Sequence, residues 1–203
     1  MEKKILYVCL IVISAYSIYQ NVQYKSHQHQ DDFLIALKEC IEVEDSCKGK
    51  IIDNIKISSY NGKEDYLDNI LSQYNREYFL VIISSIESCS TCREQTLNLW
   101  SELCKKNKGL PILLIVAEQD QLSKKDRKQI YFNIKGLHIE IPFYFDHESI
   151  LLDYLNVTPY QTPLSIILNH HKKIIAIDKA SEFTKERTVN FKKFFTALNY
   201  SGG

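Results

Sequence analysis

The sequence predicts an α/β protein in which helices sandwich a mixed central sheet, preceded by an N-terminal membrane helix or signal segment. Two continuous apolar runs, 78–84 and 111–117, are each followed by a helical pattern, and such runs are typical of strands buried on both faces of a parallel sheet. Two later strands, 164–168 and 173–177, are joined by a short turn and therefore add an antiparallel pair.

The other elements follow from hydrophobic periodicity and from the breakers between segments. In chain order we expect helices at 33–43, 66–74, 89–106, 122–134, 149–155 and 184–198, and further strands at 51–58 and 141–145. Lys48-Gly49-Lys50 ends the first of these helices, and Tyr60-Asn61-Gly62-Lys63 is typical of a hairpin turn. The last helix carries Phe191, Phe194 and Phe195 at helical spacing, so we expect all three to face the core.

The first residues of the chain are typical of a targeting segment. Lys3 and Lys4 precede an apolar stretch, and the 20 uncharged residues between Lys4 and Lys25 would span roughly 30 Å as a helix, about one hydrocarbon core. We expect residues 1–27 to be a signal anchor, the alternative being a signal peptide cleaved at the weak site Ala15-Tyr16-Ser17. Because the lysines stay inside, the rest of the chain lies outside the cytoplasm.

Length and composition indicate one folded domain. The chain has 203 residues, 45% of them hydrophobic, and its 25 basic and 25 acidic residues cancel to zero net charge. This composition excludes global disorder, and without a basic block we expect no nucleic-acid partner. We expect residues 28–47 to form a linker, polar at 26–32, and a short helix, and residues 48–203 to form the domain.

One pair among the six cysteines has a spacing that carries chemistry. Cys89 and Cys92 form a CxxC motif between a predicted buried strand and a predicted helix. On a first helical turn their Cα atoms would lie roughly 5 Å apart, within the range of a disulfide. The helix N-terminus favours a thiolate at Cys89, which makes it the candidate nucleophile. Cys92, one turn into the helix, is the candidate resolving thiol.

Four neighbouring side chains are candidates for tuning the pKa of these thiols. Arg93 adds positive charge, which favours the thiolate, whereas Glu87 opposes it if its carboxylate faces the sulfur. The hydroxyls of Ser90 and Thr91 can donate hydrogen bonds to a thiolate. These contributions have opposite signs, so the sequence leaves the direction of the net pKa shift open.

Two other uses of the CxxC compete with redox activity. A structural zinc site needs a second cysteine or histidine pair at suitable spacing, which the sequence does not offer, so we expect no metal. An inert structural disulfide is compatible with an exported chain. Cys40 and Cys47, which flank an acidic stretch, are in addition a candidate second disulfide closing a short loop.

The order strand, CxxC, helix and a Thr-Pro pair before a late strand resemble the thioredoxin superfamily. Thr162-Pro163, directly before the strand 164–168, is similar to the cis-proline segment of that family. A hairpin at 50–63 and an extra strand and helix between 109 and 156 are similar to the TlpA-like, redoxin-type thiol–disulfide oxidoreductases. The resemblance covers roughly residues 48–198.

This resemblance implies a thioredoxin-like fold and dithiol–disulfide exchange with protein clients, in the direction of reduction. It makes Cys89 and Cys92 catalytic and Thr162-Pro163 the edge on which substrate docks. The expected partners are protein thiols and disulfides, an electron donor, and a membrane bound through the N-terminal segment, with no cofactor. The expected location is the bacterial envelope, with the domain anchored in the inner membrane and facing the periplasm, or exported after cleavage.

The sequence also departs from the family at several positions. Ser88 stands where family members usually carry Trp, Ser90-Thr91 replaces Gly-Pro or a similar pair, and the strand 78–84 has no buried acid. These departures leave open an alternative, a redox-inert thioredoxin-like binding module with a structural disulfide. A peroxiredoxin-like antioxidant is a weaker alternative, because the Pro and Thr that precede the lone cysteine of that pattern are absent.

Overall fold

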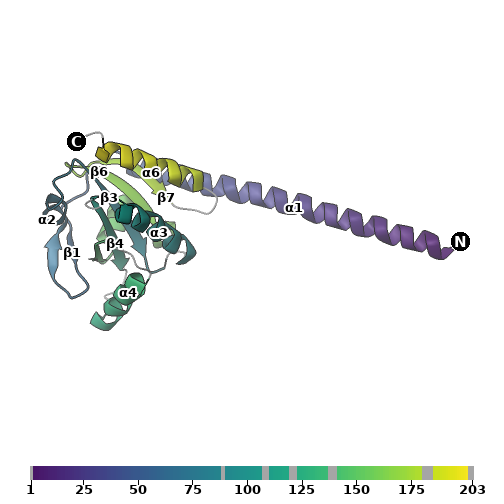
Figure 1. The fold of residues 1–203 in the computed structure, drawn as a ribbon, viewed down its shortest axis with the longest axis horizontal. Helices are drawn as coiled ribbons and strands as arrows, with labels where there is room; N and C mark the ends of the chain where they lie inside the picture. The colour runs from purple at the N-terminus through teal and green to yellow at the C-terminus, as the bar shows by residue number, and fades with distance from the viewer. Residues whose placement is uncertain are drawn as a thin grey trace.

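A computed structural model describes residues 2–87, 90–106, 110–118, 123–136, 141–179 and 185–200. Within these residues, seven strands form one mixed sheet in the order β2-β1-β5-β4-β3-β6-β7 (Figure 1). The strands are β1 (Lys56–Ser58), β2 (Glu64–Tyr66), β3 (Tyr78–Ser85), β4 (Ile112–Glu118), β5 (Phe143–His147), β6 (Leu164–Asn169) and β7 (Ile174–Lys179). The helices are α1 (Glu2–Cys47), α2 (Leu67–Ser72), α3 (Ser90–Lys106), α4 (Lys124–Gly136), α5 (Ile150–Leu155), the 3-10 turn η1 (Pro159–Gln161) and α6 (Lys185–Tyr200).

The sheet combines parallel and antiparallel pairs, as the sequence predicts. β3, β4 and β5 are parallel neighbours, whereas β6 pairs antiparallel with β3 and β7 antiparallel with β6. β1 and β2 form a hairpin whose turn contains Gly62 with φ +84°, a value that favours glycine. The strand expected at 51–58 is shorter than predicted, since Ile51 makes only an isolated bridge with Lys173.

Helices cover both faces of this sheet and enclose two cores. The end of α1 together with α2 and α5 packs on one face, and α3, α4 and α6 pack on the other. The sequence of β3 is apolar because both faces of this strand are buried. Val81 and Ile83 point into the first core and Leu80 and Ile82 into the second, because successive side chains of a strand alternate between faces. The predicted sandwich is therefore confirmed.

Trp100 is the largest fully buried side chain of the second core. Its ring meets Phe191 and Phe195 edge to face, and its Nε1–H donates to the Ser165 hydroxyl at 3.0 Å. The expectation for Phe194 is wrong, because this side chain is 44% exposed. The apolar stripe of α6 runs along positions 191, 195 and 198, and a residue one position before Phe195 is turned by about 100° out of that stripe.

α1 runs without a break from Glu2 to Cys47 and contains no glycine or proline. It therefore passes as a helix through residues 26–32, where we expected a linker, and its N-terminal part extends away from the sheet (Figure 1). It ends at Cys47, and Gly49, two residues further on, has φ +87°, as is common after a helix C-terminus. Across the part of the chain that the structure describes, no helix is both long enough and apolar enough to cross a membrane.

The last turns of α1 are part of the domain core. Val43 and Cys47 are buried in the first core, before residue 48, where we expected the domain to begin. Ion pairs hold the same turns from outside: Glu44 pairs with Arg187 of α6 at 2.7 Å, and the ammonium of Lys179 on β7 pairs with a Glu39 carboxylate oxygen. The helix is thus fixed to the sheet by both apolar burial and charge.

The predicted disulfide between Cys40 and Cys47 is wrong. Both residues lie on α1, and seven residues of helix separate their Cα atoms by about 10 Å, beyond the roughly 7 Å that a disulfide tolerates. The sulfurs also have different surroundings: the Cys40 Sγ lies 3.5 Å from the Lys179 carbonyl oxygen, and the Cys47 Sγ lies 3.4 Å from that of Leu155. The reason for the error is the continuous helix, which replaces the loop that the disulfide was expected to close.

Asp146, at the end of β5, is a fully buried carboxylate. One of its oxygens accepts a hydrogen bond from the Leu151 backbone N–H at 2.7 Å, close to the start of α5. Burial raises the pKa of Asp146 to about 6. Hydrogen bonds from backbone N–H groups lower this pKa, but they offset only part of the rise. The carboxyl group is therefore easier to protonate in the folded chain than in the unfolded one.

We expect the free energy of unfolding to fall as the pH rises from about 4 to about 6, and Asp146→Asn to remove part of this fall. Over that range the folded protein binds a proton at Asp146 that the unfolded chain has released, so deprotonation costs stability, by up to about 3 kcal/mol. Guanidinium titrations at pH 4 and pH 7 measure the difference. An equal pH dependence in the two proteins would contradict the assignment.

Candidate active site

The CxxC motif lies where β3 meets α3, at the carboxyl end of the central parallel strands. α3 begins at Ser90, so Cys92 is on its first turn, and its side chain is half-buried. Ser90 and Thr91 are exposed on the same turn. Cys89 lies outside the described residues, as does Ser88. Cys92 is therefore on the first turn of the helix and partly shielded from solvent.

Arg93 is held against the end of β3. Its Nη1 donates to the carbonyl oxygen of Ser85 at 3.1 Å and to that of Ile86 at 3.4 Å. These contacts fix the guanidinium beside the segment that leads from β3 into the CxxC. Glu87 is exposed, and its backbone N–H donates to the Ser85 hydroxyl at 3.2 Å. The positive charge is thus anchored to the protein backbone, whereas the acidic side chain is solvated.

The Thr162–Pro163 peptide bond is cis, as expected for the Thr-Pro pair before β6. The Thr162 side chain is buried, and its hydroxyl accepts a hydrogen bond from the Ser85 backbone N–H at 3.0 Å and donates to the Pro159 carbonyl oxygen at 2.7 Å. Both hydrogen-bonding functions of that hydroxyl are used within the protein. A role of this loop in docking substrate would therefore use its backbone and Pro163.

Ser85 is a residue of the site that the sequence did not single out. Its backbone N–H binds Thr162 on the cis-proline loop, and its carbonyl oxygen binds Arg93 on α3. One residue thus ties the two predicted parts of the site together. The available signal was weak: two small polar residues, Ser84 and Ser85, close a strand that is otherwise apolar. The long-range partners could not be read from that signal.

A buried charged cluster lies beside the site, one and two strands away from β3. The Glu118 carboxylate, at the end of β4, is fully buried and pairs with Arg127 Nε of α4 at 3.2 Å. The same carboxylate lies 3.1 Å from Nδ1 of His147 on β5, whose Nε2 lies 2.7 Å from the Ser58 hydroxyl. Burial raises the pKa of Glu118, and the charges of Arg127 and His147 oppose that rise.

In this cluster a serine contacts a histidine and the histidine contacts a glutamate, which is the arrangement of a hydrolytic triad. Ser58 is only 1% exposed, however, so its hydroxyl is closed to a substrate. Arg127 Nη2 also lies 2.9 Å from His147 Nδ1, the atom that a triad reserves for its acid. We therefore assign the cluster a structural role, that of holding α4 on the sheet. Glu118 of this cluster is a buried acid on β4. The absence of a buried acid noted from the sequence concerns the strand at 78–84, which is β3.

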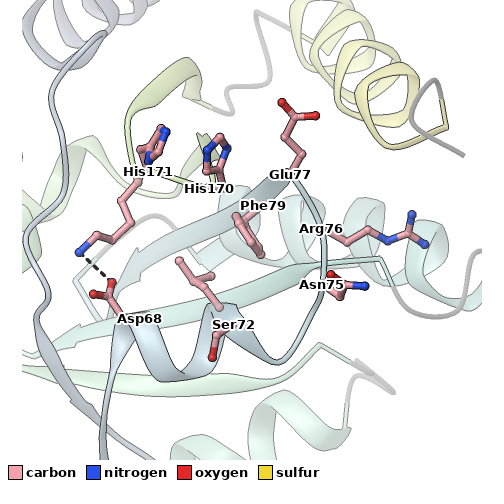
Figure 2. Close-up of a pocket in the computed structure, with 10 residues that line it drawn as sticks. Asp68, Ser72, Asn75, Arg76, Glu77, Phe79, His170 and His171 are labelled. Carbon is pink, nitrogen blue, oxygen red and sulfur yellow. Dashed lines mark ion pairs between the residues drawn. The ribbon is translucent and has the colours of Figure 1, made fainter.

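A second, larger feature is a cavity at the opposite end of β3. It measures about 710 Å³ and is open to solvent between α2, the start of β3 and the β6–β7 turn (Figure 2). Phe79 lines it on β3, and the Lys172–Asp68 ion pair, at 2.7 Å, closes one side. The cavity is separated from the CxxC end by the length of β3, about 20 Å. We therefore do not connect it with thiol chemistry.

His170 and His171 also line this cavity, from the turn between β6 and β7 (Figure 2). Both side chains are exposed, and their rings lie 3.7 Å apart between centroids. In the described ranges, no group of three or more His, Cys, Asp or Glu side chains is placed to hold a metal ion.

Solved structures of thiol–disulfide exchange proteins are similar to this chain. A candidate protein disulfide isomerase from Bacteroides thetaiotaomicron has a TM-score of 0.55 at 12% identity, covering 75% of this chain and 90% of that one. A candidate thiol:disulfide interchange protein, DsbE, from Chlorobium tepidum has the same TM-score and identity, covering 75% and 98%. The exposed lipoprotein thioredoxin Etrx1 of Streptococcus pneumoniae has a TM-score of 0.51 at 19% identity, covering 70% and 99%.

These likenesses define the fold of the chain. No protein-family model matches the sequence, and no curated protein matches it either. Three of the solved structures match with TM-scores of 0.51–0.55 at 12–19% identity, which shows the fold alone. The chain therefore has a thioredoxin-like α/β fold, as the sequence predicts.

Proposed function

We propose that the protein is an envelope-facing thiol–disulfide oxidoreductase that reduces disulfides of client proteins. Cys89 is the nucleophile and Cys92 the resolving thiol. The observation that carries the proposal is the connection at Ser85, whose backbone binds both Arg93 on the CxxC helix and Thr162 before the cis proline. The helical turn that carries Cys92 and the loop before the cis proline are thereby joined to the end of one strand.

The proposed reaction is two successive thiol–disulfide exchanges. The Cys89 thiolate attacks one sulfur of a client disulfide, a mixed disulfide forms, and the other client sulfur leaves as a thiolate. The Cys92 thiolate then attacks the Cys89 sulfur, and the client's second sulfur leaves. Two electrons pass to the client, and the Cys89–Cys92 disulfide remains. A partner dithiol must reduce that disulfide before the next turnover.

The surroundings support the first of these steps. Backbone N–H groups at the N-terminus of α3 and the guanidinium of Arg93 both favour a negative sulfur near the start of the helix. Glu87 is exposed, so solvent screens its opposing charge. Pro163 and the backbone of Thr162 supply the edge against which the client lies during attack.

The proposed location is outside the cytoplasm. Lys3 and Lys4 followed by an apolar stretch support export. DsbE and the exposed lipoprotein thioredoxin, two of the structural matches, agree with an envelope role. Residues 1–27 could serve as an anchor or as a cleaved signal. In either case the domain is delivered to the same side of the membrane.

The proposal is tested by trapping the mixed disulfide. Reduced Cys92→Ala protein incubated with insulin should accumulate a covalent adduct with an insulin chain, visible by intact mass and released by dithiothreitol, because the resolving thiol is absent. Cys104→Ala, on the same helix, is the matched control and should accumulate none. A binding module with an inert disulfide would give no adduct in either variant, and that result would refute the proposal.

A further inference from the structure

A cavity of about 280 Å³ lies beside the first turn of α3, on the side of β3 away from the cis-proline loop. Its apolar lining comes from the ends of β3 and β4 and from two helices. The apolar residues are Ile86, Leu97, Leu114, Val116, Ile130 and Ile134. Ser90, Arg93 and Glu94 form polar parts of the lining on α3. The cavity therefore borders the first turn of α3 at Ser90, which in the sequence lies between the two cysteines of the CxxC.

The sheet order separates this cavity from the substrate edge described above. β3 lies between β4 and β6. Thr162, which precedes β6, binds the end of β3 from that side, whereas Leu114 and Val116 belong to β4. The end of β3 is thus flanked by the cis-proline loop on one side and by an apolar cavity on the other.

The wall of the cavity formed by α4 is held in place by the buried charged cluster. Arg127, Ile130 and Ile134 follow one another at spacings of three and four residues and so share one helix face. Arg127 binds the Glu118 carboxylate, which continues the face of β4 that carries Val116. The ion pair fixes the helix at one end of this face and leaves the two isoleucines over the cavity.

We propose that this cavity receives one apolar side chain, of the size of leucine or phenylalanine, from a client protein close to the disulfide under attack. The inference rests on the proposed function and names its substrate class. The volume is below the range of about 300–1,000 Å³ that small-molecule sites occupy, and it fits one side chain. Arg93 and Glu94 at the lining offer a donor and an acceptor for the adjoining client backbone.

The test uses peptides that carry one cysteine as a mixed disulfide with thionitrobenzoate. Attack by Cys89 on the peptide sulfur releases the coloured thionitrobenzoate, and Cys92 then displaces the peptide thiol. Within one peptide series, phenylalanine or serine is placed one, two or three residues to either side of the cysteine. At the best position we expect phenylalanine to raise the second-order rate constant of the full chain at least tenfold over serine, because the ring is buried during attack.

Ile130→Trp, which fills the cavity from a half-buried position, should reduce that preference to less than twofold. Lys125→Trp, at an exposed position on the same helix, is the matched control and should keep it. If the tryptophan disturbs folding, Ile130→Lys is the second variant. Thermal unfolding, followed by circular dichroism, checks that each protein is folded.

A preference that is absent in the unmodified chain, or that persists in both Ile130 variants, would overturn the inference. Failure of the unmodified chain to release thionitrobenzoate from any peptide would instead overturn the proposed function.

Discussion

Replacing the predicted nucleophile, Cys89→Ser, should reduce the rate of insulin reduction by dithiothreitol to that of dithiothreitol alone. A serine hydroxyl cannot replace the thiolate in disulfide exchange, because no disulfide can form with it. The readout is the turbidity of the precipitating insulin B chain, with the full chain at a fixed concentration.

Two cysteines serve as matched controls for this experiment. Cys47→Ser alters a buried thiol on α1, and Cys104→Ser alters a half-buried thiol on the CxxC helix. Both variants should keep the activity of the unmodified chain, provided that thermal unfolding shows them folded. Undiminished activity in Cys89→Ser would exclude this residue as the nucleophile.

Trp100→Ala should lower the free energy of unfolding by about 4 kcal/mol. The indole is fully buried between α3, α6 and the sheet, so its removal leaves a cavity lined by Phe191 and Phe195 and leaves the Ser165 hydroxyl without its donor. Trp100→Phe keeps most of the volume and should cost about 1–2 kcal/mol, chiefly the lost hydrogen bond. Guanidinium denaturation at pH 7 gives both values.

The matched control is Phe194→Ala on α6, which removes an aromatic ring that is 44% exposed. This change should cost about 1–2 kcal/mol, well below Trp100→Ala, because nearly half of the Phe194 side chain stays in contact with water. If Trp100→Ala and Phe194→Ala had equal effects, Trp100 would not be the centre of the second core.

The central sheet was predictable because its signals are local. The apolar runs at 78–84 and 111–117 could be buried only between two helical layers, and they became β3 and β4. The cis bond at Thr162–Pro163 was expected from the resemblance to the thioredoxin superfamily, which the Thr-Pro pair before a clear strand carried. The strands were thus specified by short stretches of sequence, and the cis bond by a resemblance.

The errors and omissions had two sources, one local and one that depends on distant parts of the chain. The break expected at 26–32 rested on polarity, but without glycine or proline the helix continues, and this removed the loop that a Cys40–Cys47 disulfide required. The cluster around Glu118 joins three strands and a helix that are far apart in sequence. Periodicity describes one element at a time and therefore could not identify that cluster.

The reduction potential of the Cys89–Cys92 pair tests the central claim most directly. The full chain, with Cys40→Ser/Cys47→Ser as a control that isolates the pair, is equilibrated in dithiothreitol and glutathione buffers and the fraction oxidised is measured. We predict a reversible two-electron titration near about −270 mV, the value of a reducing thioredoxin. A midpoint near about −120 mV would reverse the proposed direction of exchange. A pair that does not titrate, or one that lies well below about −300 mV, would show a structural disulfide and contradict the proposed function.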